Sequence, residues 1–86
     1  MASTLDQKIQ AAILEGTQEA RSMPTSLVAS KAPMSELEAR PARKRAVLDQ
    51  ALAAARNGEF DKMRIVYAAA DVEHAKRQLA YARATR

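Results

Sequence analysis

Residues 47–72 run VLDQALAAARNGEFDKMRIVYAAADV, and this stretch decides the fold. Apolar residues recur three and four positions apart on both sides of Asn57-Gly58, which is the periodicity of an amphipathic α-helix. A glycine at this point can take the left-handed conformation that ends a helix. Because the next helix starts so soon, we predict an antiparallel hairpin with helices at about 42–57 and 59–84.

The two helices of the hairpin are predicted to pack through narrow seams rich in alanine. The residues expected to point inward from the first helix are Val47, Leu48, Ala51, Leu52 and Ala55. The seam expected on the second helix consists of Ile65, Ala68, Val72, Ala75, Leu79 and Ala82. Small residues at these spacings let two helices approach closely, so this seam is expected to hold the hairpin together.

An additional helix is predicted near the N-terminus, at about 5–21, with Ser3 or Thr4 as its N-cap. Its apolar residues share one face, except that Leu14 falls nearly opposite them. The prediction for the whole chain, 1–86, is therefore a single all-α domain, a small three-helix bundle.

The stretch 22–34 contains two prolines, three serines and a threonine, and we interpret it as a flexible linker. Its Leu27-Val28 pair either lies over a groove of the bundle or belongs to a mobile connection. The stretch 35–39 has a capping-box pattern, but Pro41 would remove a backbone donor from a helix interior. We therefore expect a short turn at 35–39 and then a helix with Pro41 at its first position.

The chain has few large apolar side chains for its length of 86 residues. Alanine supplies 20 residues, whereas Leu, Ile, Val and Phe together supply only 15. Alanine favours helix formation but buries little area, so the composition favours forming helices over holding them together. We expect a protein stabilised by a partner or by self-association, and a homo-oligomeric structural subunit is one possible reading.

Charge is distributed unevenly, with a net charge of −2 over residues 1–39 and +6 over residues 40–86. The sharpest cluster lies at the expected start of the second helix and consists of Arg40, Arg43, Lys44 and Arg45. Cations in the first turn of a helix oppose its dipole, so a partner could account for them. The alternative is an ordinary solvated face whose cations pair with Glu36, Glu38 or Asp49.

Antiparallel packing would bring this cluster to the same end as four cations of the last helix. These are Lys76, Arg77, Arg83 and Arg86, and we call the combined set the basic pole. Tyr81 would lie within it. Such a surface could contact an acidic protein groove, or it could bind RNA or DNA through phosphate contacts and stacking.

Four ring-bearing residues recur every seven positions along the last predicted helix. They are Phe60, Tyr67, His74 and Tyr81, and this aromatic column lies more than about 100° around the helix from the Ile65 seam. Either the N-terminal helix covers the column, or part of it, especially the Tyr81 end, stays open as an interface.

The sequence lacks the residue sets that catalytic, metal or cofactor sites require. His74 is the single histidine, no cysteine is present, and the two glycines are too far apart for a phosphate-binding loop. We expect no enzyme activity and no cofactor. No signal peptide or stretch of transmembrane length stands out, so we expect a cytoplasmic location without membrane contact.

The helix, Asn-Gly turn and longer helix over residues 42–83 resemble the helical-hairpin co-chaperones of bacterial type III secretion. That resemblance implies a protein that binds another protein. Small phage- or plasmid-encoded proteins that modulate a host enzyme match the size and composition equally well. The leading hypothesis is a protein-interaction module, an inhibitor, adaptor or co-chaperone, that binds an acidic or groove-shaped protein.

We expect that partner to contact the basic pole and the aromatic column. The expected contact residues are Arg40, Arg43, Lys44, Arg45, Phe60, Tyr67, His74, Arg77, Tyr81 and Arg83. A nucleic-acid-binding hairpin protein and a homo-oligomeric structural subunit are the alternatives.

Overall fold

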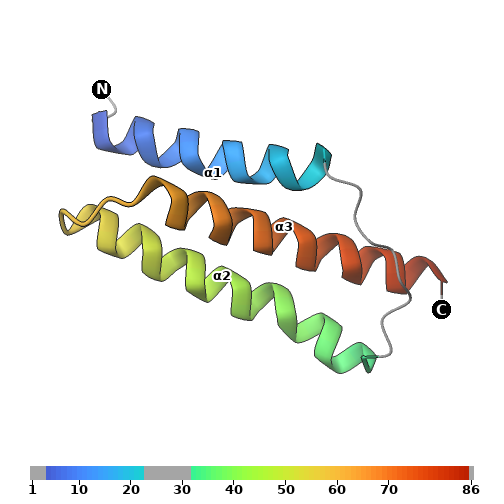
Figure 1. The fold of residues 1–86 in the computed structure, drawn as a ribbon. Helices are drawn as coiled ribbons and strands as arrows, with labels where there is room; N and C mark the ends of the chain where they lie inside the picture. The colour runs from blue at the N-terminus through green and yellow to red at the C-terminus, as the bar shows by residue number, and fades with distance from the viewer. Residues whose placement is uncertain (1–3, 23–31, 86) are drawn as a thin grey trace.

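A computed structural model describes residues 4–22 and 32–85, which form three helices. These are α1 (Thr4–Ser22), α2 (Met34–Arg56) and α3 (Lys62–Thr85). Helix α3 lies between the other two and packs against both, whereas α1 and α2 scarcely touch each other (Figure 1). The predicted all-α bundle, built from a hairpin and an N-terminal helix, is confirmed.

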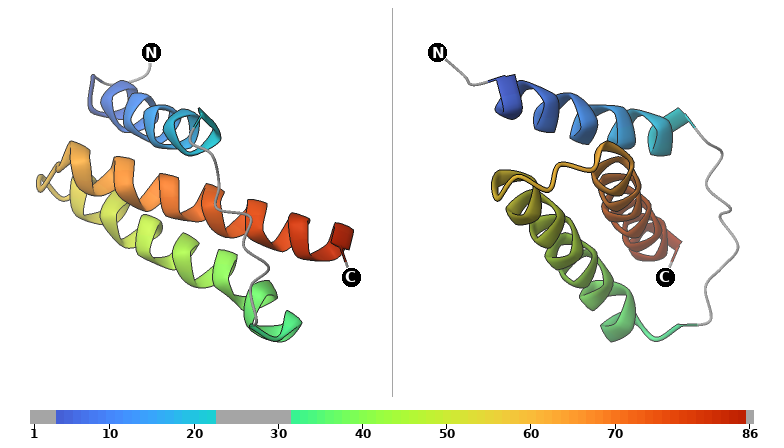
Figure 2. Two further views of the ribbon diagram at one scale, coloured as in Figure 1. Left: turned by 45° about the vertical axis from the view of Figure 1, so that its right-hand side comes forward. Right: turned by 60° about the vertical axis from the view of Figure 1, so that its left-hand side comes forward.

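The direction of the helices follows from the turn between α2 and α3. Helix α2 runs antiparallel to α3, as predicted, and α1 runs in the same direction as α3 (Figure 2). The long connection between α1 and α2 makes this parallel arrangement possible. Most of that connection, residues 23–31, lies outside the described residues, as does the Leu27-Val28 pair. Ser22 ends α1 and Met34 begins α2, so both ends of the predicted linker are helical.

The turn ends α2 in the way that the Asn57-Gly58 pair predicts. Gly58 has a φ of 95°, its N–H donates to the Ala55 carbonyl at 3.2 Å, and the Glu59 N–H donates to the Ala54 carbonyl at 2.9 Å. These two bonds satisfy carbonyls that the helix end would otherwise leave free, in the Schellman arrangement. The stop signal is therefore confirmed at the level of individual hydrogen bonds.

Helix α3 begins three residues later than predicted, at Lys62 rather than at 59. Asp61 sets the start, because its carboxylate accepts the backbone N–H of Arg64 at 3.2 Å. An aspartate in this position satisfies one of the donors that a helix start leaves unpaired.

The prediction for the start of α2 is wrong. There is no separate turn at 35–39, and Pro41 lies inside a helix that already begins at Met34. The N-cap is Pro33, which has no side-chain cap, and its carbonyl accepts the N–H groups of Glu36 and Leu37. Pro41 costs one backbone hydrogen bond, but the continuous helix buries Leu37 almost completely.

Large and small side chains share the core between the helices. The large residues of the buried cluster are Ile9, Leu48, Leu52, Ile65, Val66 and Val72, and alanines fill the remaining positions. Val47 is exposed rather than inward and Leu79 is only half-buried, so those two parts of the predicted seams are wrong.

Helix α1 packs on α3 through a row of small residues, Ala12, Gly16 and Ala20, all buried. A Cβ atom added at Gly16 would collide with the Val66 carbonyl and would lie 3.0 Å from the Ala69 side chain. The two backbones are therefore too close at this point for any residue with a side chain in place of Gly16. The predicted apolar face of this helix is confirmed, and Leu14 is exposed as expected.

Polar contacts fasten both ends of the α1–α3 interface. Lys62 pairs with Glu15 at 3.2 Å, and Arg21 pairs with Glu73 at 3.0 Å. Arg77 donates to the Ala20 carbonyl at 2.8 Å, at the C-terminal end of α1. These bonds lie along the contact between the two parallel helices and add to the packing of Ala12, Gly16 and Ala20 on α3.

Within residues 4–22 and 32–85, no helix combines the length and the apolar character needed to cross a membrane.

Candidate functional site

Helix α3 carries three apolar rows but has only two helical neighbours. The row through Ile65, Ala68 and Val72 is buried toward α2, and the row through Val66 and Ala69 is buried toward α1. A third row remains, spaced by four, three, four and seven positions. It consists of Met63, Tyr67, Ala70, His74 and Tyr81, and we call it the open row.

The open row is uncovered most completely in the first turns of α3. The exposed fraction is 62% for Tyr67 and 46% for Met63, which are large values for apolar or aromatic side chains. Ala70, His74 and Tyr81 are half-buried. The open end of the aromatic column is thus the Tyr67 end rather than the Tyr81 end.

The expectation that the N-terminal helix covers the whole aromatic column is wrong. Helix α1 packs instead on the row through Val66 and Ala69, because only small side chains and a glycine allow the close approach seen there. Phe60 does not join the open row, since it precedes α3 and packs against the core beside α1.

Val47 of α2 lies on the same side of the hairpin as Tyr67. Glu38 and Arg83 pair across the other side, with 3.9 Å between Oε1 and Nη2. Val47 is about 180° around α2 from Glu38, and Tyr67 is about 160° around α3 from Arg83. Both residues therefore lie on the side of the hairpin that faces away from the Glu38–Arg83 pair. Val47 is 49% exposed, so a second apolar side chain is open to solvent on this side of the hairpin.

The arginines of the predicted cluster are engaged within the chain. Arg43 donates to the Glu36 carboxylate, and Arg40 lies 3.6 Å from the same oxygen. Arg45 pairs with Asp49 at 3.1 Å, one turn further along α2. The alternative interpretation, a solvated face with internal ion pairs, therefore accounts for these arginines.

The Glu36 carboxylate has a shifted titration because of these neighbours. The hydrogen bond from Arg43 lowers the pKa of Glu36 below its ordinary value of 4.5, and the charges of Arg43 and Arg40 act in the same direction. Glu36 lies at the beginning of α2 and Arg43 two turns later, so the pair bridges the turn that contains Pro41.

The helix-dipole argument for the basic cluster does not hold. Because α2 begins at Met34, Arg43, Lys44 and Arg45 lie in the middle of the helix, where the dipole exerts little effect. Lys44 is exposed and makes no ion pair with any described residue.

The predicted basic pole does not form a single patch among the described residues. Glu36 and Glu38 are about 200° apart around α2, so their arginine partners lie on different sides of the hairpin. Arg77 faces α1 and donates to its terminal carbonyls. Arg86 lies outside the described residues.

Three exposed residues of this region were not among the predicted contact residues, namely Val47, Met63 and Arg64. Met63 continues the spacing of Tyr67, Ala70 and His74 toward the N-terminus, a pattern that is visible in the sequence. The helical spacing of its neighbours predicts Val47 in the core. Spacing alone does not distinguish it from Leu48, which the neighbouring helix covers, whereas Val47 stays exposed.

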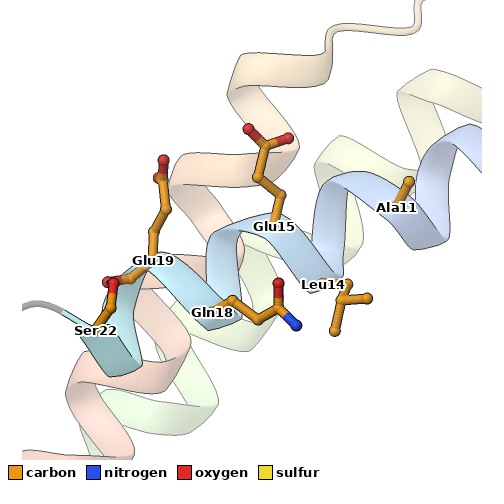
Figure 3. A pocket seen from close by; sticks show the side chains of 6 residues that line it. All are labelled: Ala11, Leu14, Glu15, Gln18, Glu19 and Ser22. Atoms are coloured by element: carbon orange, nitrogen blue, oxygen red, sulfur yellow. The ribbon is translucent and has the colours of Figure 1, made fainter.

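The described residues contain no group of three or more His, Cys, Asp or Glu that could hold a metal ion. One shallow depression lies on the outer face of α1, lined by Ala11, Leu14, Glu15, Gln18, Glu19 and Ser22 (Figure 3). All of its lining side chains come from one helix, so it is a surface feature and not an enclosed cavity.

Comparisons of the chain with protein-family models, with curated proteins and with solved structures gave no match. The proposal for function therefore rests on the geometry of the exposed surface.

Proposed function

We propose that this chain is a non-enzymatic protein-interaction module, a small inhibitor, adaptor or co-chaperone, that binds its partner through the open row of α3. The observation that carries the proposal is the exposure of Tyr67 and Met63 on a helix whose other two apolar rows are already packed. Exposed apolar side chains gathered on one face are typical of binding surfaces, whereas scattered ones are not.

The chemistry of the open row favours a protein partner. Tyrosine offers a large contact area at a small cost in side-chain entropy, and methionine adapts to irregular surfaces. Val47 broadens the surface to two helices. A groove-shaped or helical partner could therefore bury a continuous apolar strip along α3.

The arginines have a secondary role in this proposal. Arg40, Arg43 and Arg45 already pair with carboxylates, so using any of them for a partner requires breaking an internal ion pair. Exposed pairs of this kind contribute only about 0 to 1 kcal/mol, so the exchange is feasible but not strongly favoured. We expect these arginines to affect the rate of association more than the lifetime of the complex.

The test is capture of a partner from a lysate of the source cell on the immobilised full chain. A partner retained by the unmodified chain and lost on Tyr67→Ser, but retained by Arg56→Ser, supports the proposal. Arg56 is the control because it is exposed but lies about 180° around α2 from Val47, away from the open row. With the purified partner, Tyr67→Ser should raise the dissociation rate by the equivalent of about 2 kcal/mol.

A nucleic-acid ligand would give a different result. Micromolar or tighter binding of a labelled RNA at physiological salt, abolished by alanine at Arg43, Lys44 and Arg45 and insensitive to Tyr67→Ser, would overturn the proposal. In that case the affinity should fall steeply as the salt concentration rises, because each phosphate contact releases counterions from the nucleic acid.

A further inference from the structure

Two exposed charges, Glu19 and Arg64, lie at helix ends where the helix dipole disfavours them. Glu19 is in the last turn of α1, and Arg64 is in the first turn of α3. Neither side chain forms an ion pair with a described residue, although most of the other arginines do. Charges placed against the dipole and left unpaired stabilise nothing within the monomer.

Each of these charges belongs to a stretch of helix that also carries an exposed apolar side chain. Glu19 lines the depression on α1 together with Ala11 and with Leu14, which is 56% exposed (Figure 3). Its six lining residues include two carboxylates, of which Glu15 pairs with Lys62 and Glu19 makes no ion pair with a described residue. We call this set, Ala11, Leu14, Glu15, Gln18, Glu19 and Ser22, the α1 patch.

Arg64 is flanked on α3 by the most exposed part of the open row. Met63 precedes it and Tyr67 lies one turn later, and we call these three residues the α3 patch. Asp71 follows one further turn along the helix and is also exposed. That carboxylate limits the positively charged part of the surface to the beginning of α3.

We propose that the α1 patch of one copy of this chain binds the α3 patch of a second copy. The inference rests on the proposed function and identifies a partner for the open row. In this arrangement Leu14 contacts Tyr67 and Met63, while Glu19 pairs with Arg64. The unpaired charges of the two patches are thus opposite, and both patches offer exposed apolar side chains to each other.

The composition of the core supports a second copy as the occupant. Among the residues that the structure describes, alanines make up eight of the 15 buried apolar residues, so the monomer buries little area for its length. Association that covers Leu14, Met63 and Tyr67 would remove from water three of the four large apolar residues that are exposed in residues 4–22 and 32–85. Because the two patches are different, each copy can bind one neighbour through its α1 patch and another through its α3 patch.

The test is sedimentation velocity on the full chain over a range of concentrations at physiological salt. We expect the unmodified chain to associate, and Glu19→Arg and Arg64→Glu to weaken association at least about tenfold, because each places like charges together. The double variant Glu19→Arg/Arg64→Glu should restore association, since the swapped charges again attract.

The substitutions are suited to this test because both improve the charge at a helix end. Arginine near the end of α1 and glutamate near the start of α3 complement the helix dipole, so circular dichroism should show full helicity. Lys44→Glu is the control, because Lys44 is equally exposed and unpaired but lies outside both patches. It should leave association unchanged.

A chain that stays monomeric at all concentrations overturns the inference, and so does a double variant that fails to regain association. Both outcomes are separable from the proposed function. If Tyr67-dependent capture of another protein persists while the chain remains monomeric, the proposed function stands and the second copy is excluded as the partner.

Discussion

Gly16 of α1 lies so close to the Val66 carbonyl of α3 that the space left between the two backbones cannot hold a methyl group. Val66 is itself completely buried, so its backbone has no room to move away. The contact therefore sets the distance between two parallel helices. It also explains why α1 packs on this row of α3 and leaves Tyr67 uncovered.

Gly16→Ala should destabilise the protein, although alanine favours a helix over glycine by about 1 kcal/mol. The added methyl group must separate α1 from α3, and overpacking of this kind costs about 1 to 3 kcal/mol. Chemical denaturation measures the effect, and amide exchange should become faster throughout α1. Gln18→Ala is the control, because Gln18 is exposed on the same helix. An unchanged or higher stability for Gly16→Ala would contradict the close contact.

Val72→Asp should unfold the protein, because Val72 is buried on the row of α3 that packs against α2. A carboxylate there would have no partner, and burying an unpaired charge costs several kcal/mol. Val47→Asp makes the same chemical change at an exposed position and should leave the helices intact. Circular dichroism compares the two, and a fully helical Val72→Asp protein would show that the hairpin register is wrong.

The hairpin is predictable from sequence because its signals are local. Asn57-Gly58 ends α2 through bonds to residues within five positions, and the apolar spacing on either side needs no tertiary information. The start of α2 is not predictable in this way. The preference of proline for the first turn of a helix is a local property of the backbone. The burial of Leu37 and the ion pairs of Glu36 are contacts beyond that turn, and they stabilise a helix that continues through Pro41.

The assignment of the faces of α3 is the part that sequence leaves open. The rows through Val66 and through Met63 have similar spacing and similar apolar content, so periodicity does not tell which one α1 covers. The close contact of Gly16 with the backbone of Val66 identifies the row that α1 covers, and this contact is not visible in the spacing of apolar residues. The pairing of Arg43 with Glu36, seven positions away, likewise depends on side-chain geometry.

Gly58→Ala should lower stability by about 1 to 2 kcal/mol, the cost of a left-handed conformation for a residue with a Cβ atom. No atom lies within 4 Å of the position that the new methyl group would take, so crowding contributes nothing. Thermal or chemical denaturation gives the magnitude. Gly58→Asn should be milder, because asparagine adopts this conformation more readily. Equal losses for the two variants would point to a cause other than backbone conformation.

The carboxyl group of Glu36 should titrate below its ordinary pKa of 4.5. A lowered folded-state pKa means that its stabilising contribution is present above the unfolded value and is lost as the pH falls through the folded value. Carbon-detected NMR titration measures this directly. Arg43→Ala should move the pKa of Glu36 back toward 4.5, whereas Arg45→Ala, which removes the partner of Asp49, should leave it unchanged. Equal effects of the two variants would exclude the specific Arg43 bond as the cause.

Arg77→Ala should loosen the C-terminal end of α1. The guanidinium of Arg77 donates to the Ala20 carbonyl at 2.8 Å and to the Arg21 carbonyl at 3.3 Å, and both carbonyls belong to the last turn, where a helix has no acceptor partners of its own. We expect a loss of about 1 kcal/mol, with faster amide exchange confined to α1 and to the turns of α3 beside it.

Arg83→Ala provides the comparison for Arg77, because Arg83 forms only an exposed ion pair with Glu38 at 3.9 Å. Its removal should change stability little. Arg77→Lys should cost less than Arg77→Ala, since lysine keeps a positively charged donor near the end of α1, and both bonds of Arg77 come from the single nitrogen Nη1. If Arg77→Ala lowered the stability as little as Arg83→Ala does, Arg77 would not be needed to hold α1 and would be free to contact a partner, as the sequence predicts. A loss confined to Arg77 would instead show that this arginine holds α1 in place.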